Sequence, residues 1–156
     1  MTTWAFNVTT MAASEYQAFE FDSLATHHGY ALGVRPDGIY VLDGADDDGE
    51  SIDAYVRTGL MDLGTSDRKA IRKAYLYLKS DQPVYLKAVY DEGDTRTSLW
   101  YELAASPSDP LQQRSIDIGR GAKGVHWAFE VANIDGGALD LRGFDVVPVV
   151  LARRYR

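Results

Sequence analysis

The chain contains no cysteine in its 156 residues. This absence excludes disulfides, thiolate zinc sites and cysteine nucleophiles, and it suits a reducing compartment. No segment approaches the roughly 20 apolar residues that a membrane helix requires. The first residues also lack the basic opening and apolar core of a signal peptide. We therefore expect a soluble protein that is made in the cytoplasm and has no membrane partner.

Basic residues are scarce. Sixteen Lys and Arg face 23 Asp and Glu, which gives a net charge of −7. A surface of this sign disfavours binding to a phosphate backbone, so nucleic acid is not an expected partner. The charge is uneven, however, because residues 43–50 (DGADDDGE) hold five carboxylates while the C-terminus is basic.

Opposite charges at two places favour head-to-tail association of copies, although solvated charge without a partner is the simpler alternative. The predicted interface residues are Arg153, Arg154, Arg156, Asp46, Asp47 and Asp48.

Extended segments recur every 8 to 15 residues and are separated by turn signals, a spacing typical of a sandwich or barrel. The expected strands cover residues 4–9, 16–22, 30–34, 38–42, 52–58, 71–79, 83–90, 97–103, 114–118, 124–134 and 139–151. Thr65 and Asp67 could cap a short helix through Arg72, but residues 74–78 (AYLYL) favour a strand buried on both faces.

The predicted fold is therefore an all-β, antiparallel β-sandwich, jelly-roll-like or a partly open barrel. It has about ten strands, at most one short helix, and one domain over residues 1–156.

The last 38 residues carry the clearest pattern. Val125, Trp127, Phe129 and Val131 fall on one parity, with His126, Ala128 and Glu130 between them, which is the period of a strand with one buried face. Residues 133–137 (NIDGG) then favour a reversal, and a second extended run comes after them. We expect the chain to end in a long hairpin.

Motifs for catalysis are missing. Gly119, Gly121 and Gly124 match the letters G-x-G-x-x-G, but a dinucleotide site needs a helix to open at the third glycine, and the residues after Gly124 have the period of a strand. No nucleophile elbow, H-E-x-x-H or P-loop lysine motif is found. We predict no enzyme activity, no catalytic residues and no cofactor.

Metal sites have weak support. His27 and His28 are adjacent, and neighbours in a strand point to opposite faces, so they could share a metal only if they lie in a loop; a partly exposed surface pair is the expectation. The acidic loop fails as an EF-hand because Tyr55 stands where the terminal carboxylate belongs. A looser cation site is a weak candidate, since packed carboxylates repel one another. Its residues would be Asp46, Asp48 and Glu50.

Ten tyrosines and five phenylalanines suit half-buried pleated surfaces. Exposed aromatics could instead stack on sugars, with Trp100, Tyr101 or Trp127 as platforms. A third hypothesis, a small-molecule binder in the barrel interior, needs a cavity of roughly 300 Å³ or more, and nothing in the sequence asks for one.

Four blocks appear in a characteristic order. They are WAFNVTTMA at residues 4–12, GIYVLDGADDDG at 38–49, RTGLMDLGTSDRKAIRKAYLYLKSDQP at 57–83, and GRGAKGVHWAFEVANIDGGALDLRGFDVVPVVLARR at 119–154. Together they resemble a family of tailed-bacteriophage virion proteins, and the similarity spans nearly the whole chain. Leu63 and Leu139 stand where an aromatic would be expected, and both keep an apolar side chain.

The resemblance implies a structural component of the virion, in the tail or at the head-tail junction, present in several copies. Its partners would be other virion proteins and copies of itself, and it implies no catalytic residues. The alternative is a receptor-facing, carbohydrate-binding module of a tail fibre or spike.

Overall fold

All regular structure in the described part of the chain is β. The computed structural model describes residues 2–17, 19–44, 46–47, 49–92, 94–107 and 111–151. Their contacts group the chain into two compact units, Met1–Gly44 and Ala45–Arg156. No low-complexity linker separates the two units in the sequence, which is why the sequence predicts one domain. The predicted sandwich corresponds to the second unit.

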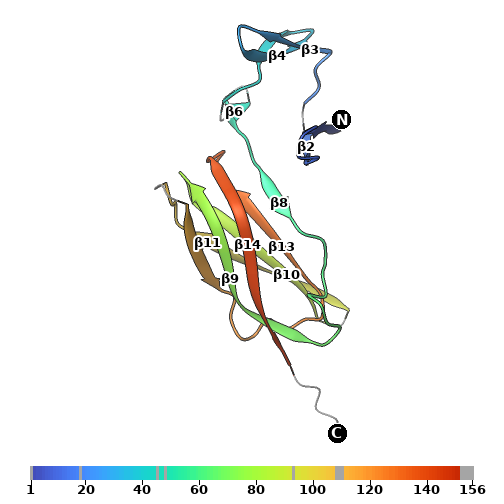
Figure 1. Cartoon of the computed structure of the whole chain (residues 1–156), viewed down its shortest axis with the longest axis vertical. Helices are drawn as coiled ribbons and strands as arrows, with labels where there is room; N and C mark the ends of the chain where they lie inside the picture. The colour runs from blue at the N-terminus through green and yellow to red at the C-terminus, as the bar shows by residue number, and fades with distance from the viewer. Residues whose placement is uncertain are drawn as a thin grey trace. The chain divides into compact units, whose positions relative to one another are not determined.

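The first unit consists of two small antiparallel sheets (Figure 1). One is a ribbon of two strands, β1 (Thr2–Phe6) and β2 (Ala13–Gln17). The Asn7 side chain shapes the turn between them by accepting hydrogen bonds from the backbone N–H groups of Thr9 and Thr10. The other sheet joins β3 (Ser23–His27), β4 (Tyr30–Arg35) and β5 (Gly38–Val41) in chain order.

Very little of the first unit is buried. Among its described residues only Gly33 is buried, and a Cβ added there would lie 2.5 Å from a ring carbon of Phe21. The guanidinium of Arg35 lies over two aromatic rings, 4.5 Å from the centroid of Phe21 and 5.1 Å from the centroid of Tyr40. The first unit therefore has an aromatic cluster rather than a core.

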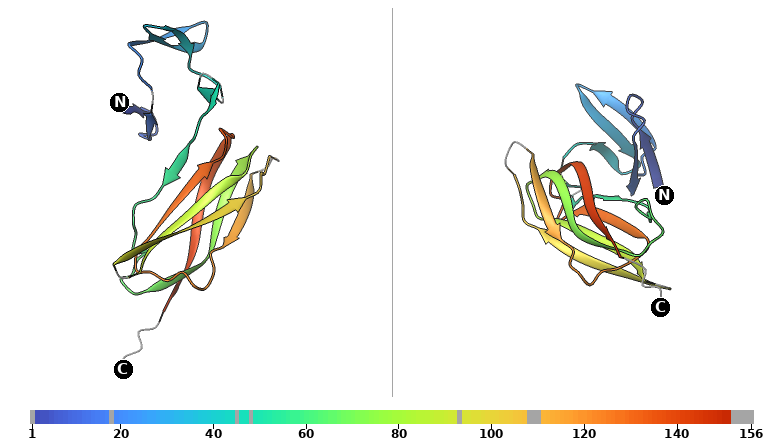
Figure 2. Two further views of the ribbon diagram at one scale, coloured as in Figure 1. Left: turned by 180° about the vertical axis from the view of Figure 1, so that it is seen from behind. Right: turned by 60° about the horizontal axis from the view of Figure 1, so that its bottom comes forward.

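The second unit begins with a short hairpin, β6 (Asp46–Asp47) and β7 (Glu50–Ser51), and continues as a sandwich of two antiparallel sheets. Figures 1 and 2 show these sheets as two layers. The first sheet has the order β11-β10-β13-β8 and the second the order β12-β9-β14. Their bounds are β8 (Tyr55–Arg57), β9 (Lys69–Ser80), β10 (Val84–Glu92), β11 (Thr95–Leu103), β12 (Gln112–Asp117), β13 (Trp127–Asn133) and β14 (Leu139–Val150).

The hydrophobic core lies between these two sheets. Trp127 and Phe129 of β13 are buried, as the predicted parity requires, and Leu76 and Leu86 are buried with them. The ring of Phe129 meets that of Phe144 on the opposite sheet, with centroids 5.0 Å apart. The prediction of an all-β, antiparallel sandwich is confirmed.

The predicted terminal hairpin is wrong. β13 pairs with β10 and β8, whereas β14 pairs with β9 in the other sheet. Residues 134–138 therefore carry the chain across the core, with Asp135 and Gly136 at positive φ. The side chain of Asn133 holds this corner: it donates to the carbonyl oxygens of Gly137 and Ile52 and accepts from the N–H of Ala54. Turn chemistry favours a reversal but does not decide which sheet receives the next strand.

The ambiguous segment at residues 65–79 is a strand from Lys69 onward, and residues 65–68 form a loop before it. β9 begins at Lys69, and the described residues contain no helix at Thr65–Arg72 or after Gly124. Only one face of its 74–78 stretch is buried, because Tyr77 is exposed, so the expectation of burial on both faces is wrong. Gly124, the third glycine of the nucleotide-like motif, instead forms an antiparallel bridge with Lys69.

Lys69 is a buried cation that no sequence pattern singled out. Its ammonium donates to the carbonyl oxygens of Thr65, at 2.8 Å, and Val125, at 2.6 Å. Burial lowers the pKa of this lysine, while Asp62 and Asp67 act in the opposite direction. These two carbonyl acceptors give Lys69 a structural role in joining the loop before β9 to the glycine-rich segment.

Tyr101 generates a pH prediction. Its hydroxyl lies on the inner side of β11 and donates a hydrogen bond to the carbonyl oxygen of Ile118 at 2.7 Å. Burial raises the pKa of Tyr101 above its ordinary 10.0, and the electrostatic effect of Tyr90 raises this pKa further. A raised pKa means that the stabilisation is complete below pH 10.0 and is lost as pH rises through the pKa of the folded state.

At neutral pH we expect Tyr101→Phe to lower the free energy of unfolding by about 0.5–1.5 kcal/mol, the usual net value of one hydrogen bond. Urea denaturation at rising pH should then show this difference narrowing above pH 10.0, because only the wild type loses the contribution. A difference that stays constant up to the alkaline limit would contradict the assignment.

Candidate functional site

A row of charged side chains crosses the outer face of the β8–β13–β10–β11 sheet. Lys87 on β10 lies directly opposite Trp100 on β11 and Glu130 on β13, and Glu130 lies directly opposite Arg57 on β8. Residues paired in this way project from the same face. The sheet register thus builds a row of aromatic, cation, anion and cation from four strands.

Glu130 is the centre of this row. Its side chain is only 10% exposed, and its Oε2 accepts a hydrogen bond from Arg57 Nε and forms an ion pair with Arg57 Nη2. The Arg57 guanidinium also lies over the ring of Tyr55, 5.2 Å from its centroid. A nearly buried carboxylate is stable only when it is paired and hydrogen-bonded, so Arg57 holds Glu130 in position.

A cavity of about 360 Å³ opens beside this row. Small side chains in the next row, Ser98, Val89 and Ala128, leave the space. The charged groups that line it are three cations and one carboxylate, Arg57, Lys87, Arg96 and Glu130. Arg57 is paired with Glu130 and Arg96 with Asp91, so Lys87 gives the cavity a positive charge that no carboxylate of the described residues pairs with. On a protein whose net charge is −7, the cavity therefore suits an anionic group.

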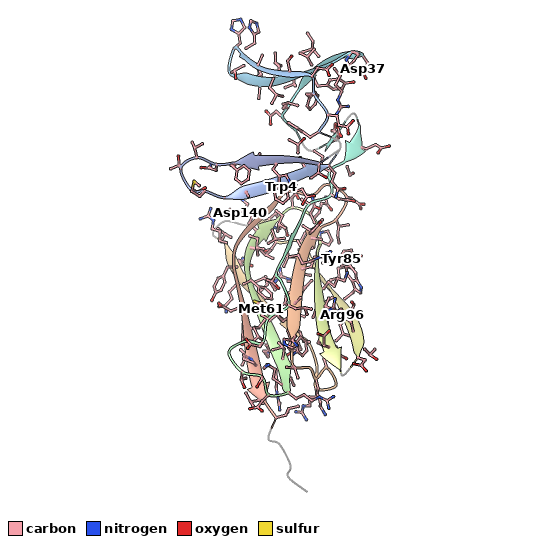
Figure 3. The ribbon with its side chains drawn as sticks, turned by 90° about the vertical axis from the view of Figure 1, so that its right-hand side faces the viewer. Trp4, Asp37, Met61, Tyr85, Arg96 and Asp140 are labelled. Atoms are coloured by element: carbon pink, nitrogen blue, oxygen red, sulfur yellow. The ribbon has the colours of Figure 1, made fainter. Side chains whose placement is uncertain are left out.

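Aromatic rings border the same face. Trp100 is 56% exposed; Tyr85 meets it in a T-shaped contact with centroids 6.3 Å apart, and the Lys87 ammonium lies 4.6 Å from the centroid of Trp100. Tyr85 and Arg96 point outward from this side of the sandwich (Figure 3). The other two predicted platforms are not on the surface face: Trp127 is fully buried, and Tyr101 directs its hydroxyl to Ile118 inside.

A second candidate region is the set of exposed apolar side chains in the first unit. Trp4 and Phe6 of β1 are 56% and 65% exposed, and Val8 and Met11 in the turn after β1 are more exposed still. In the β3–β5 sheet, Tyr30, Ile39 and Val41 are exposed on one face and Leu24 on the other. Glu15 is the only charged residue between positions 2 and 17. Exposed apolar side chains in this number mark a protein–protein interface or an aggregation hazard.

The predicted interface residues fall in two groups. Asp46 and Asp47 form β6 and are exposed, with Asp47 directly opposite Glu50 of β7. The others lie outside the described residues, namely Asp48, Arg153, Arg154 and Arg156. The contact between the acidic loop and the basic tail thus stays a prediction.

The sequence also offered metal ligands in the acidic loop and among the histidines. The predicted cation set includes Asp48, which lies outside the described residues, so that hypothesis stays open. Within the described ranges no three His, Asp or Glu side chains gather where they could hold a metal ion. His27 ends β3, and His28 lies next to it in a turn with a φ of 48°. The two rings are in edge contact. In the second unit, His126 Nδ1 lies 3.8 Å from Asp91 Oδ2.

Comparison with protein-family models, with curated proteins and with solved structures found no match to this chain. The described part of the chain also contains no helix that is long and apolar enough to cross a membrane.

Sequence reasoning missed the charged row. Glu130 was placed correctly on the parity opposite to Trp127 and Phe129, but its partner Arg57 lies 73 residues away. A carboxylate between buried apolar positions was the available signal, because such a group needs a cation. The identity of that cation depends on strand order, which local patterns do not contain.

The Arg57–Glu130 pair yields a stability prediction. Arg57→Ala should lower the free energy of unfolding by about 1–3 kcal/mol, because it leaves a nearly buried carboxylate without its partner. Adding Glu130→Gln should recover part of that loss, since a neutral amide costs less to bury. Urea denaturation of the single and double variants measures both effects. An Arg57→Ala variant with the same free energy of unfolding as the wild type would contradict the stabilising role of the pair.

Proposed function

We propose that this protein is a structural component of a bacteriophage virion, in the tail or at the head-tail junction, that assembles in several copies through protein–protein contacts. The observation that carries the proposal is the number of exposed apolar side chains in the first unit. Its two-stranded ribbon is of a kind that is marginal in water without further packing. Apolar side chains of this kind gain stability when they are buried, as they would be against a partner.

The composition of the ribbon supports the same function. Residues 2–17 carry a single charge and present Trp4, Phe6, Val8 and Met11 to solvent. Permanent interfaces are more apolar than transient ones and resemble a core that has been divided between chains. The resemblance of the four sequence blocks to phage virion proteins points in the same direction.

A building role also fits the second unit. It supplies a rigid sandwich, and it displays an acidic hairpin and a cationic cavity at different places on its surface. Contacts between unlike patches are heterologous and close into rings when the rotation allows. Quantitative mass spectrometry of purified particles tests virion membership and copy number: several copies per particle are expected, and absence from particles contradicts the proposal.

The ribbon generates an assembly prediction. The purified full chain should self-associate, and Trp4→Ser combined with Phe6→Ser should weaken that association at least about tenfold, because a central apolar anchor typically contributes about 2 kcal/mol or more. Sedimentation velocity over a concentration series measures the change. The matched control is Val147→Ser with Val150→Ser, two exposed apolar residues of β14. Equal effects of the two double variants would contradict the role of the ribbon.

Carbohydrate binding is the second candidate, and the exposed Trp100 favours it. The ring lies beside the polar side chains of Lys87 and Glu102, which is the combination that sugar recognition uses. We expect host surface polysaccharide to change the tryptophan fluorescence, and Trp100→Ala to remove the change. Trp4→Ala is the matched control, because Trp4 is exposed to the same extent. A change that survives Trp100→Ala, or none in the wild type, would exclude this function.

A further inference from the structure

The β6–β7 hairpin brings like charges together. Asp47 and Glu50 are directly opposite each other in its ladder, and like charges in that arrangement are destabilising. Both are exposed, and in the described part of the chain neither carboxylate forms an ion pair with a cation. The hairpin pairs with no other strand among the described residues. Its geometry leaves a repulsion that a cationic partner would relieve.

The cavity on the outer face of the sheet offers the complementary charge. Its Arg57 is neutralised by Glu130, and Arg96 contacts Asp91 through Nε at 3.1 Å. Lys87 contacts a ring instead of a carboxylate. A cation–π contact that is partly exposed to water is weak, so a carboxylate can take its place. Lys87 is therefore the first group that an incoming anion would meet, and Arg96, which is 62% exposed and contacts Asp91 through Nε alone, offers its other guanidinium nitrogens beside it.

The hairpin of the same chain is held away from this cavity. Residues 52–54 come directly after β7, and Ile52 and Ala54 are fixed to Asn133 at the end of β13. The cavity lies toward the other end of that strand, beside Ala128, Phe129 and Glu130. A hairpin that reached its own cavity would have to break the Asn133 hydrogen bonds. The hairpin of another copy has no such restriction.

We propose that the cavity of one copy receives the acidic hairpin of the next copy, with the carboxylates of Asp47 and Glu50 meeting Lys87 and Arg96. This inference rests on the proposed function, because it requires copies to assemble. The contact joins two different patches, so it is heterologous and directional. A volume of about 360 Å³ accommodates the side chains of a hairpin tip.

Charge reversal on each side tests the contact. The cavity variant carries Lys87→Glu and Arg96→Glu, and the hairpin variant carries Asp47→Lys and Glu50→Lys. Sedimentation velocity of the full chain at low salt should show association weakened roughly tenfold or more in each variant. An equimolar mixture should recover it, because the intact hairpin of the first variant fits the intact cavity of the second. Wild-type association should also weaken as salt rises.

The controls separate charge, folding and location. Lys73→Glu with Arg120→Glu makes the same change of charge away from the cavity and should leave association unchanged. If the cavity variant does not fold, Lys87→Gln with Arg96→Gln removes the two charges without adding others, and it should weaken association in the same way. Arg153→Glu with Arg154→Glu tests the C-terminal tail as the other receptor for the hairpin.

The outcomes are distinct. Wild-type association that none of the cavity and hairpin variants weakens would overturn this inference and leave the proposed assembly standing. If Arg153→Glu with Arg154→Glu weakens association and the cavity variants do not, the hairpin binds the C-terminal tail of another copy, and the role of the cavity is overturned. A wild-type chain that remains monomeric at every concentration would overturn both the contact and the proposed function.

Discussion

Burial between two sheets is the constraint on which the rest of the structure depends. Every buried hydrophobic side chain in the described residues lies between Ala70 and Val131, and the rings of Phe129 and Phe144 join the sheets across the core. Apolar burial is the main source of folding free energy, so the sandwich obtains nearly all of it. The strands of residues 2–44 obtain little, although they carry some of the largest apolar side chains. This imbalance is the physical reason to regard the chain as a part of an assembly.

The same core also positions the candidate site. β13 turns Trp127, Phe129 and Val131 inward and Ala128 and Glu130 outward, so one strand supports both the core and the floor of the cavity. Side chains mounted on a packed strand keep their geometry better than those on loops. This support is consistent with the proposed role of the cavity as a receptor for the acidic β6–β7 hairpin, whose two strands pair only with each other in the described part of the chain.

Local patterns in the sequence predicted much of the sandwich. Alternation identified the buried face of β13, and the strand-like continuation after Gly124 ruled against a nucleotide-binding helix. Non-local features were not predictable in this way. The turn at residues 133–137 leads to the other sheet rather than to a hairpin, and Arg57 meets Glu130 from a distant segment. The exposure of Trp4 and Phe6 was not predictable either, because an exposed aromatic and a buried one have the same local pattern.

The central claim is that residues 2–44 are stabilised by contact with other copies, whereas the sandwich is stable by itself. Hydrogen exchange of the full chain, followed over a range of protein concentrations, tests this most directly, because amide protection reports local opening. The account predicts that β9, β10 and β13 are protected at every concentration, and that β1 to β5 gain protection only as copies associate. Equal protection of β1 to β5 in the dilute, monomeric chain would contradict it.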